Sequence, residues 1–315
     1  MALAASRAVR VPRNLSGATR TRTPRGYNPP ATDLWRFPIV TLHREELLGI
    51  AHAERDRLGR TIQYAPAASW DGPSPCEGWR NKDVMAHMAA QETAAAQLIG
   101  GEAAEEFDAF RQANGGDLWV NGFNEWAVQL RAELPARQVI GDWGRAVDLF
   151  LMRASKIDPA EWDAKKIPWV AGEIGVKYLI QSRAIEWWLH GEDIREGAGL
   201  EENLQHWPIF LTNDMGIRML PYSLDQAGLA FPGKSVRVDL EGMGGGSWHW
   251  GLAPRESPPQ DKKPDAFVDG RAYAFALTAG RRVSGEAFLD DGSLVVGGDE
   301  EIALAVLEHV HAYVE

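Results

Sequence analysis

Apolar residues recur at helical spacing over much of the chain. Between residues 43 and 62 an apolar side chain recurs at intervals that place Leu47, Ile50 and Leu58 on one face, which predicts an amphipathic helix. The same pattern extends the mostly helical region from about residue 41 to about 228. Further helices are expected from Asn81, as N-cap, towards Gly100, over 117–134, over 136–157, through residues 186–190, and over 207–227.

The pattern changes after about residue 231. Val236, Val238 and Leu240 alternate with polar residues, which indicates a strand, and the run M-G-G-G-S-W-H-W-G-L reads as a turn into a second strand. A solvated loop, P-R-E-S-P-P-Q-D-K-K-P-D, comes next. The remainder predicts a helix over 272–280, a strand over 293–296 and a helix over 299–314. We therefore expect an α+β protein with a helical region over 39–230 and a small α+β domain over 231–315.

The first residues differ from both regions. Residues 1–32 contain six arginines, four prolines and no acidic residue. Such a segment buries too little apolar surface to fold, so we expect a disordered basic arm over 1–38. An organelle-targeting peptide is the alternative, and a non-structured extension or an early start codon is the reading we prefer.

Composition narrows the function classes. With 45% apolar and 24% charged residues, the chain is typical of a soluble globular protein, and no run of about 18 apolar residues indicates a membrane span. A net charge of −11 argues against binding nucleic acid. Cys76 is the only cysteine, which precludes an intrachain disulfide and fits a reducing compartment. We expect a cytoplasmic monomer or homodimer that acts on a small molecule.

Glu186 and His190 carry the most specific chemistry. Four residues are a little over one helical turn, so both side chains project from one face of a helix. His87 lies on the helix that begins near Asn81. If that helix packs against the first, two imidazoles and a carboxylate meet, a ligand set that binds zinc and leaves a position open for chemistry.

The residues alone leave other interpretations open. Glu186 could pair with Arg183 one turn back, with His190 and His87 as hydrogen-bonded core histidines. Glu202 and His206 have the same spacing, but they lie at a helix start next to a proline and need not share a face.

Two stretches resemble a known family. S-P-C-E-G-W-R-N-K-D-V-M-A-H-M and R-A-I-E-W-W-L-H-G-E-D-I-R are similar to the two signatures of the mycothiol-dependent maleylpyruvate isomerase family. Near the C-terminus, L-E-G-M-G-G-G-S-W, A-L-T-A-G-R and G-D-E-E-I-A-L-A-V-L also resemble it, so the match covers about residues 41–315. The resemblance implies a DinB-like four-helix bundle that binds a divalent metal, followed by a sterol-carrier-like α+β domain.

The resemblance also implies a site and a reaction. His87, Glu186 and His190 would be the metal ligands, zinc the expected ion and mycothiol the thiol cosubstrate. A metal-bound thiol is deprotonated near neutral pH. In the isomerase reaction the thiolate adds to a cis double bond conjugated to a carbonyl, the single bond rotates, and elimination gives the trans product. Relatives that stop after substitution are S-transferases.

Further residues receive expected roles, Arg281 from the resemblance and Asp193 and Cys76 from their positions in the sequence. The substrate would be a small electrophilic acid, maleylpyruvate-like, and Arg281 in A-G-R is the expected catalytic cation, with Arg282 as the alternative and surface solvation as the plain reading of both. Asp193 could orient a ligand imidazole, or end the helix in solvent. Cys76 is assigned to packing. The competing function is a non-catalytic metal-binding or small-molecule-binding regulatory protein that uses the same site, and a purely structural bundle is the third possibility.

Overall fold

The computed structural model describes residues 42–170, 172–229, 231–254 and 262–313. The basic arm expected over 1–38 lies outside the described residues, as does the middle of the loop between residues 254 and 265. From Leu42 onward the chain clusters as one unit.

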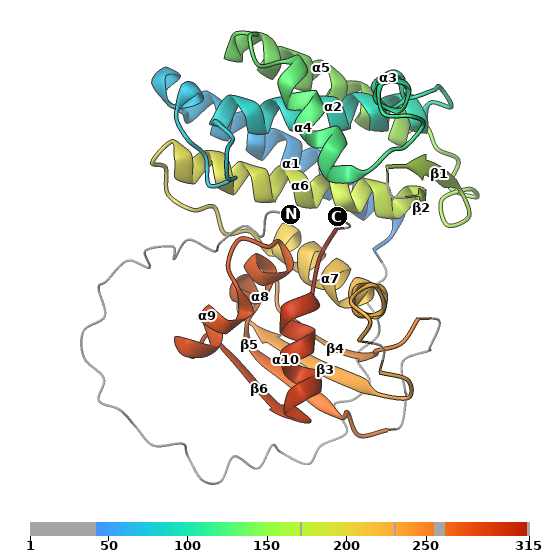
Figure 1. The fold of residues 1–315 in the computed structure, drawn as a ribbon, viewed down its shortest axis with the longest axis vertical. Helices are drawn as coiled ribbons and strands as arrows, with labels where there is room; N and C mark the ends of the chain where they lie inside the picture. Colours follow the sequence, from blue (N-terminus) through green and yellow to red (C-terminus); the bar gives the residue numbers. More distant parts are fainter. Residues whose placement is uncertain (1–41, 171, 230, 255–261, 314–315) are drawn as a thin grey trace. The chain divides into compact units, whose positions relative to one another are not determined.

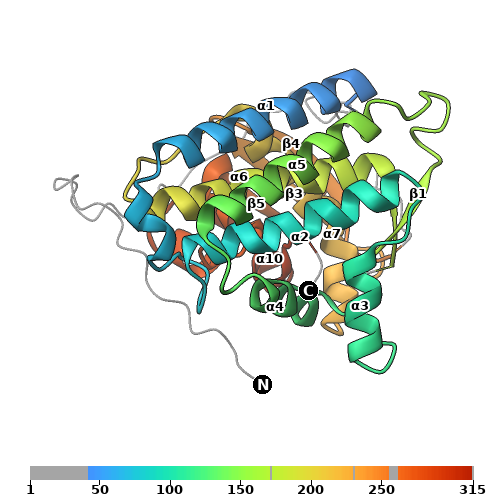
Figure 2. The same cartoon turned by 90° about the horizontal axis from the view of Figure 1, so that it is seen from above.

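Four long helices form a bundle in which each contacts two neighbours. In Figures 1 and 2 they run side by side. Their buried apolar side chains form one core cluster. The bundle helices are α1 (Arg44–Tyr64), α2 (Asn81–Ile99), α5 (Ala136–Ala154) and α6 (Val176–Gly197). Met88, Val147 and Ile185 are among the fully buried side chains, as their helical spacing requires. In the described part of the chain, no helix is long and apolar enough to cross a membrane.

A smaller aromatic cluster lies beside the bundle. Between α2 and α5 the chain forms α3 (Glu105–Ala113) and α4 (Val120–Leu130), whose buried rings Phe107, Phe110 and Phe123 pack edge to face. Helix α3 was not predicted, because only two of its apolar side chains face inward. These rings form a core separate from that of the bundle.

A short hairpin precedes α6, in a stretch for which the sequence pattern predicts no helix or strand. There β1 (Lys166–Trp169) pairs antiparallel with β2 (Gly172–Gly175). Gly172 has a φ of 114°, a conformation that only glycine adopts readily, and it closes the turn. The Pro-rich loop before α2 likewise contains one short 3₁₀ helix, η1 (Ala67–Asp71).

The C-terminal part is built on a four-stranded sheet in the order β4-β3-β5-β6. Its central strands, β3 and β5, run parallel, and both edge strands are antiparallel to their neighbours. The strands are β3 (Ser235–Glu241), β4 (Gly246–Gly251), β5 (Ala266–Arg271) and β6 (Leu294–Gly298). The α+β class predicted from the pattern is confirmed, although β5 was not predicted because so short a run shows little alternation.

Helices connect the sheet to the bundle. α7 (His206–Gln226) contacts α6 on one side and β4 on the other, which Figure 1 shows as an intermediate position. The remaining helices are α8 (Ala272–Ala279), α9 (Gly285–Asp290), which was not predicted, and α10 (Glu300–His309). At the end of α8, Gly280 lies so close to α6 that a Cβ there would come within 2.6 Å of Leu189. Because of this close approach, the residues that follow Gly280 lie beside α6.

Candidate metal centre

The structure brings His87, Glu186 and His190 together. Glu186 and His190 project from one face of α6, and His87 faces them from α2. Glu186 Oε2 lies 3.3 Å from His87 Nε2 and 3.2 Å from His190 Nε2. The three potential ligand atoms lie within 4.8 Å of one another, so a single divalent cation could contact all of them.

The site is buried but not closed. His87 and His190 are 6% and 8% exposed, and the Glu186 side chain is 15% exposed. The imidazole rings are 4.9 Å apart between centroids. All three side chains thus keep a small exposed surface, largest at Glu186.

Asp193 sets the tautomer of His190. Its Oδ2 lies 2.8 Å from His190 Nδ1, so the Nδ1 proton is donated to the carboxylate. That leaves the Nε2 lone pair directed at Glu186 and His87, as a metal ligand requires. Without a cation, Nε2 must itself be protonated to donate to Glu186. The donor set therefore fits a divalent metal.

The pKa shifts agree with this geometry. Burial alone would lower the pKa of His190, but hydrogen bonds to Asp193, Cys76 and Glu186 outweigh it and hold this pKa well above its usual value. Burial would raise the pKa of Glu186, but the two histidines and Arg183 hold it well below its usual range. Burial lowers the pKa of His87. The surroundings thus favour the charged forms of Glu186 and His190 and the neutral form of His87.

His87 is held mainly by ring packing. The Trp79 ring lies 5.4 Å from it, and the Trp79 indole N–H in turn donates to Glu125 Oε2 at 3.2 Å. Within the described residues, His87 Nδ1 has no hydrogen-bond partner. The two ligand histidines therefore differ: a carboxylate orients one and an aromatic ring the other.

The ion pair between Glu186 and Arg183, the alternative interpretation of the sequence, is also present. Arg183 Nη2 lies 3.6 Å from Glu186 Oε2, which is longer than a hydrogen bond. The structure therefore contains the elements of both interpretations, and the shorter distances are those to the histidines.

Arg282 contacts this region, whereas Arg281 is exposed. The Arg282 guanidinium donates to both oxygens of Asp193, at 2.6 and 3.0 Å, and Nη2 lies 3.4 Å from His190 Nδ1. Although burial disfavours its charge, the nearby Asp193 raises the pKa of Arg282, so it stays charged. Arg281 has a left-handed backbone with φ of 59° and turns to solvent. The residue held as the alternative is thus the one that reaches the triad.

Two further side chains were not anticipated here. The Cys76 thiol, assigned to packing by the sequence, donates to Asp193 Oδ2 at 3.3 Å. Tyr313 accepts from Arg282 Nη1 at 2.9 Å and donates to the Gly280 carbonyl at 2.7 Å. Only the motif P-C-x-x-W pointed to Cys76, and no signal marked Tyr313, because the contacts bridge distant parts of the chain.

The second pair with the same spacing does not form a site. Glu202 precedes α7, and His206 is the first residue of that helix, so they do not share a helical face. His206 Nδ1 accepts a hydrogen bond from the Gly244 backbone at 3.1 Å. Its role is to hold the β3–β4 turn.

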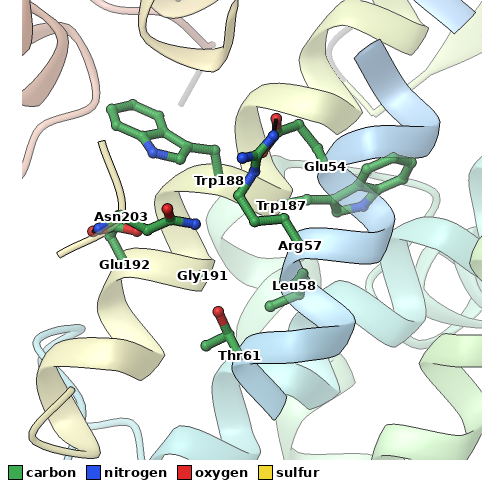
Figure 3. A pocket seen from close by; sticks show the side chains of 9 residues that line it. All are labelled: Glu54, Arg57, Leu58, Thr61, Trp187, Trp188, Gly191, Glu192 and Asn203. Atoms are coloured by element: carbon green, nitrogen blue, oxygen red, sulfur yellow. Dashed lines mark hydrogen bonds and ion pairs between the residues drawn. The ribbon is translucent and has the colours of Figure 1, made fainter. Parts of the chain in front are cut away.

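A small crevice lies on another face of α6, towards α1 (Figure 3). Trp188 and Glu192, four residues apart, face it, whereas Glu186 and His190 face α2, as the helical repeat dictates. Its volume of ≈10 Å³ holds about one water molecule. It is too small for a substrate and distinct from the triad.

Known proteins match most of the chain. Residues 51–195 match the family model described as mycothiol maleylpyruvate isomerase N-terminal domain. An uncharacterized protein of Mycobacterium tuberculosis, recorded in two strains, is 25% identical over 238 residues, covering 74% of this chain and 84% of the relative.

Two solved structures share the fold. The crystal structure of the mycothiol-dependent maleylpyruvate isomerase superposes with a TM-score of 0.56 at 15% identity, covering 82% of this chain and 95% of that chain. A histidine-to-alanine mutant of that enzyme gives the same TM-score at 14% identity. At these identities the likeness is one of fold.

Proposed function

The chain belongs, through residues 51–195, to the family of the mycothiol maleylpyruvate isomerase N-terminal domain, and on this premise we propose that it is a divalent-metal-dependent enzyme using a low-molecular-weight thiol. The thiol is mycothiol, and the reaction is isomerisation or S-transfer on a small electrophilic acid of the maleylpyruvate type. The observation that carries the proposal is the convergence of His87, Glu186 and His190 within 4.8 Å.

The protein's own residues prepare this chemistry. Asp193 holds the His190 proton on Nδ1, at 2.8 Å, so that Nε2 is free to bind a cation. Glu186 offers its oxygen between the two imidazoles, 3.2 and 3.3 Å from their nitrogens. A divalent metal in this place, with zinc as the expected ion, would lower the pKa of a bound thiol so that it reacts as the thiolate.

Arg282 takes the role first assigned to Arg281. Of the two arginines, Arg282 lies nearer the triad, and it donates two hydrogen bonds to Asp193. A substrate carboxylate that approached His190 would meet this guanidinium. We therefore propose that Arg282 orients Asp193 and attracts an acidic substrate, and Arg281 becomes its matched control.

The first test is metal binding by the purified protein. We expect about one equivalent of zinc per chain, and a His87→Ala variant should lose more than about 100-fold in affinity, since it lacks a ligand. His52→Ala, at an exposed position on α1, is the control and should bind normally. Undiminished metal binding by His87→Ala would contradict the proposed site.

The second test is turnover. With mycothiol and maleylpyruvate, the loss of the conjugated cis substrate can be followed by absorbance. Arg282→Gln should lower kcat/KM more than Arg281→Gln does. Metal binding without turnover on any electrophilic acid would instead support a non-catalytic binding protein.

A further inference from the structure

Arg183 lies between the buried carboxylate of Glu92 and the partly buried carboxylate of Glu186, and it forms a close contact with neither. It is 4% exposed, with Nη2 3.6 Å from Glu186 Oε2 and Nε 3.7 Å from Glu92 Oε1. Hydrogen bonds to carboxylates are usually 2.7–2.9 Å long. Within the described residues, Arg183 Nε has no hydrogen-bond partner. The Trp169 ring covers the guanidinium at 5.6 Å.

Glu92 is the less expected of the two carboxylates. It lies on α2, fully buried, and its Oε1 accepts a hydrogen bond of 2.7 Å from the Trp187 indole. Its Oε2 has no partner among the described residues. Burial raises the pKa of Glu92 to about 7, although Arg183 and Trp187 oppose the shift. A buried acid with one unused oxygen is costly to retain for packing alone.

We propose that Arg183 is a positioning residue shared by Glu186 and Glu92, and that a divalent cation bound at His87, Glu186 and His190 shifts its guanidinium towards Glu92. This inference rests on the metal site proposed above. In this proposal, Glu92 pairs with Arg183 when the cation is bound.

Electrostatics give the direction of the shift. A divalent cation at Glu186 Oε2 would repel a guanidinium nitrogen that lies 3.6 Å from the same oxygen. On the other side, Arg183 Nε–H and Glu92 Oε2 are both unused. A movement of about 1 Å would bring Nε into hydrogen-bond range of Glu92. This movement would both reduce the repulsion between the cation and Arg183 and form a closer ion pair between Arg183 and Glu92.

The two carboxylates therefore have opposite effects on Arg183. Glu186 attracts it when the triad holds no cation, and Glu92 retains it when the triad does. Without Glu92, Arg183 would remain beside Glu186 and compete with the metal. Without Arg183, that competition disappears. Two static pairs would instead give independent effects that add in the double variant.

The test is a double-mutant cycle on zinc affinity, measured on the full chain by competition with a chromophoric chelator. E92Q should weaken zinc binding about 10-fold, and R183M should bind at least as tightly as the wild type. The double variant E92Q/R183M should bind as R183M does, because Glu92 acts only through Arg183. Because R183M alone leaves Glu92 unpaired and could unfold, the double variant carries the comparison, with thermal unfolding of each apo-protein as the check.

Glu54→Gln is the matched control. Glu54 is 2% exposed but pairs with Arg57 on α1, away from the triad, so zinc affinity should not change. As a second readout, zinc should change the fluorescence of Trp187, taken as the difference between the wild type and Trp187→Phe, because its hydrogen-bond acceptor gains a new partner.

The outcomes separate this inference from the proposed function. Equal zinc affinity of E92Q and the wild type, or a double variant that binds as weakly as E92Q, overturns only the shared role of Arg183. A wild-type protein that binds no divalent metal overturns the metal site, and this inference with it.

Discussion

Two glutamates with little exposed surface, Glu54 on α1 and Glu186 on α6, differ in what surrounds their carboxylates. Glu54 is 2% exposed, and Arg57 on the same helix satisfies both of its oxygens at 3.0 and 3.1 Å. The Glu186 side chain is 15% exposed, and it meets two imidazoles and one guanidinium drawn from two helices. Glu54 is neutralised locally, whereas Glu186 faces nitrogen atoms that can bind a cation. Burial of a glutamate therefore does not by itself indicate a metal site. Imidazole nitrogens that lie next to the carboxylate do.

The largest expected effect contrasts these two residues directly. Glu186→Gln removes an anionic ligand, so zinc affinity should fall more than about 100-fold. Glu54→Gln should leave zinc affinity unchanged, because its partner is Arg57. Titration calorimetry on both variants measures the contrast. Equal losses would mean that Glu186 acts through stability, as Glu54 does.

The next effect concerns the orientation of a ligand. Asp193→Asn weakens the acceptor of the His190 Nδ1 proton, and substitutions of such partners cost about 10- to 100-fold in metal affinity. Glu192→Gln changes the neighbouring residue, which faces the crevice instead, and should bind zinc normally. Chelator competition on both proteins is the measurement. Normal zinc binding by Asp193→Asn would show that Asp193 does not support metal binding.

A smaller effect should appear in the pH dependence of stability. The pKa of Glu92 is about 7 in the folded protein against 4.5 as its ordinary value, so between these values the folded state binds more protons than the unfolded state. Stability from this group is complete below about pH 4.5 and is lost as the pH rises to about 7. Glu92→Gln should remove about 1–3 kcal/mol of that decline. Urea unfolding of both proteins at pH 5 and pH 8 tests this, and parallel declines would contradict it.

The smallest effect lies on the Glu54 side. Arg57→Gln removes the pair with Glu54, whose pKa burial already raises, so the carboxyl can take up a proton instead. We expect a loss of about 1 kcal/mol in the free energy of unfolding and no change in zinc affinity. Chemical denaturation and chelator competition on the same preparation check both parts. A change in zinc affinity would contradict this prediction, because it would show that the Glu54–Arg57 pair influences the metal site.

The comparison also explains which residues sequence reasoning placed well. Helical spacing put Glu186 and His190 on one face, and the structure has them one turn apart on α6. Spacing alone could not rank them above Glu202 and His206, although His206 begins α7 and Glu202 precedes it. The helix start next to Pro208 set that second pair aside, and the family resemblance, supported by the match over residues 51–195, joined Glu186 and His190 to His87.

The sequence by itself determined the local features: the long helices, the change to strands after α7, and the α+β class. These depend on periodicity within a few turns, where neighbouring side chains decide the conformation. Elements with little periodicity, such as α3 and β5, needed their packing partners.

Only the tertiary structure decided what meets at the triad. Arg282 rather than Arg281 contacts Asp193, because the approach of Gly280 to Leu189 directs the chain after α8. Glu92 and Arg183 lie on different helices, and no spacing rule joins them. Charges interact through space rather than along the chain, so their partners are set by how helices pack, which the order of residues does not display.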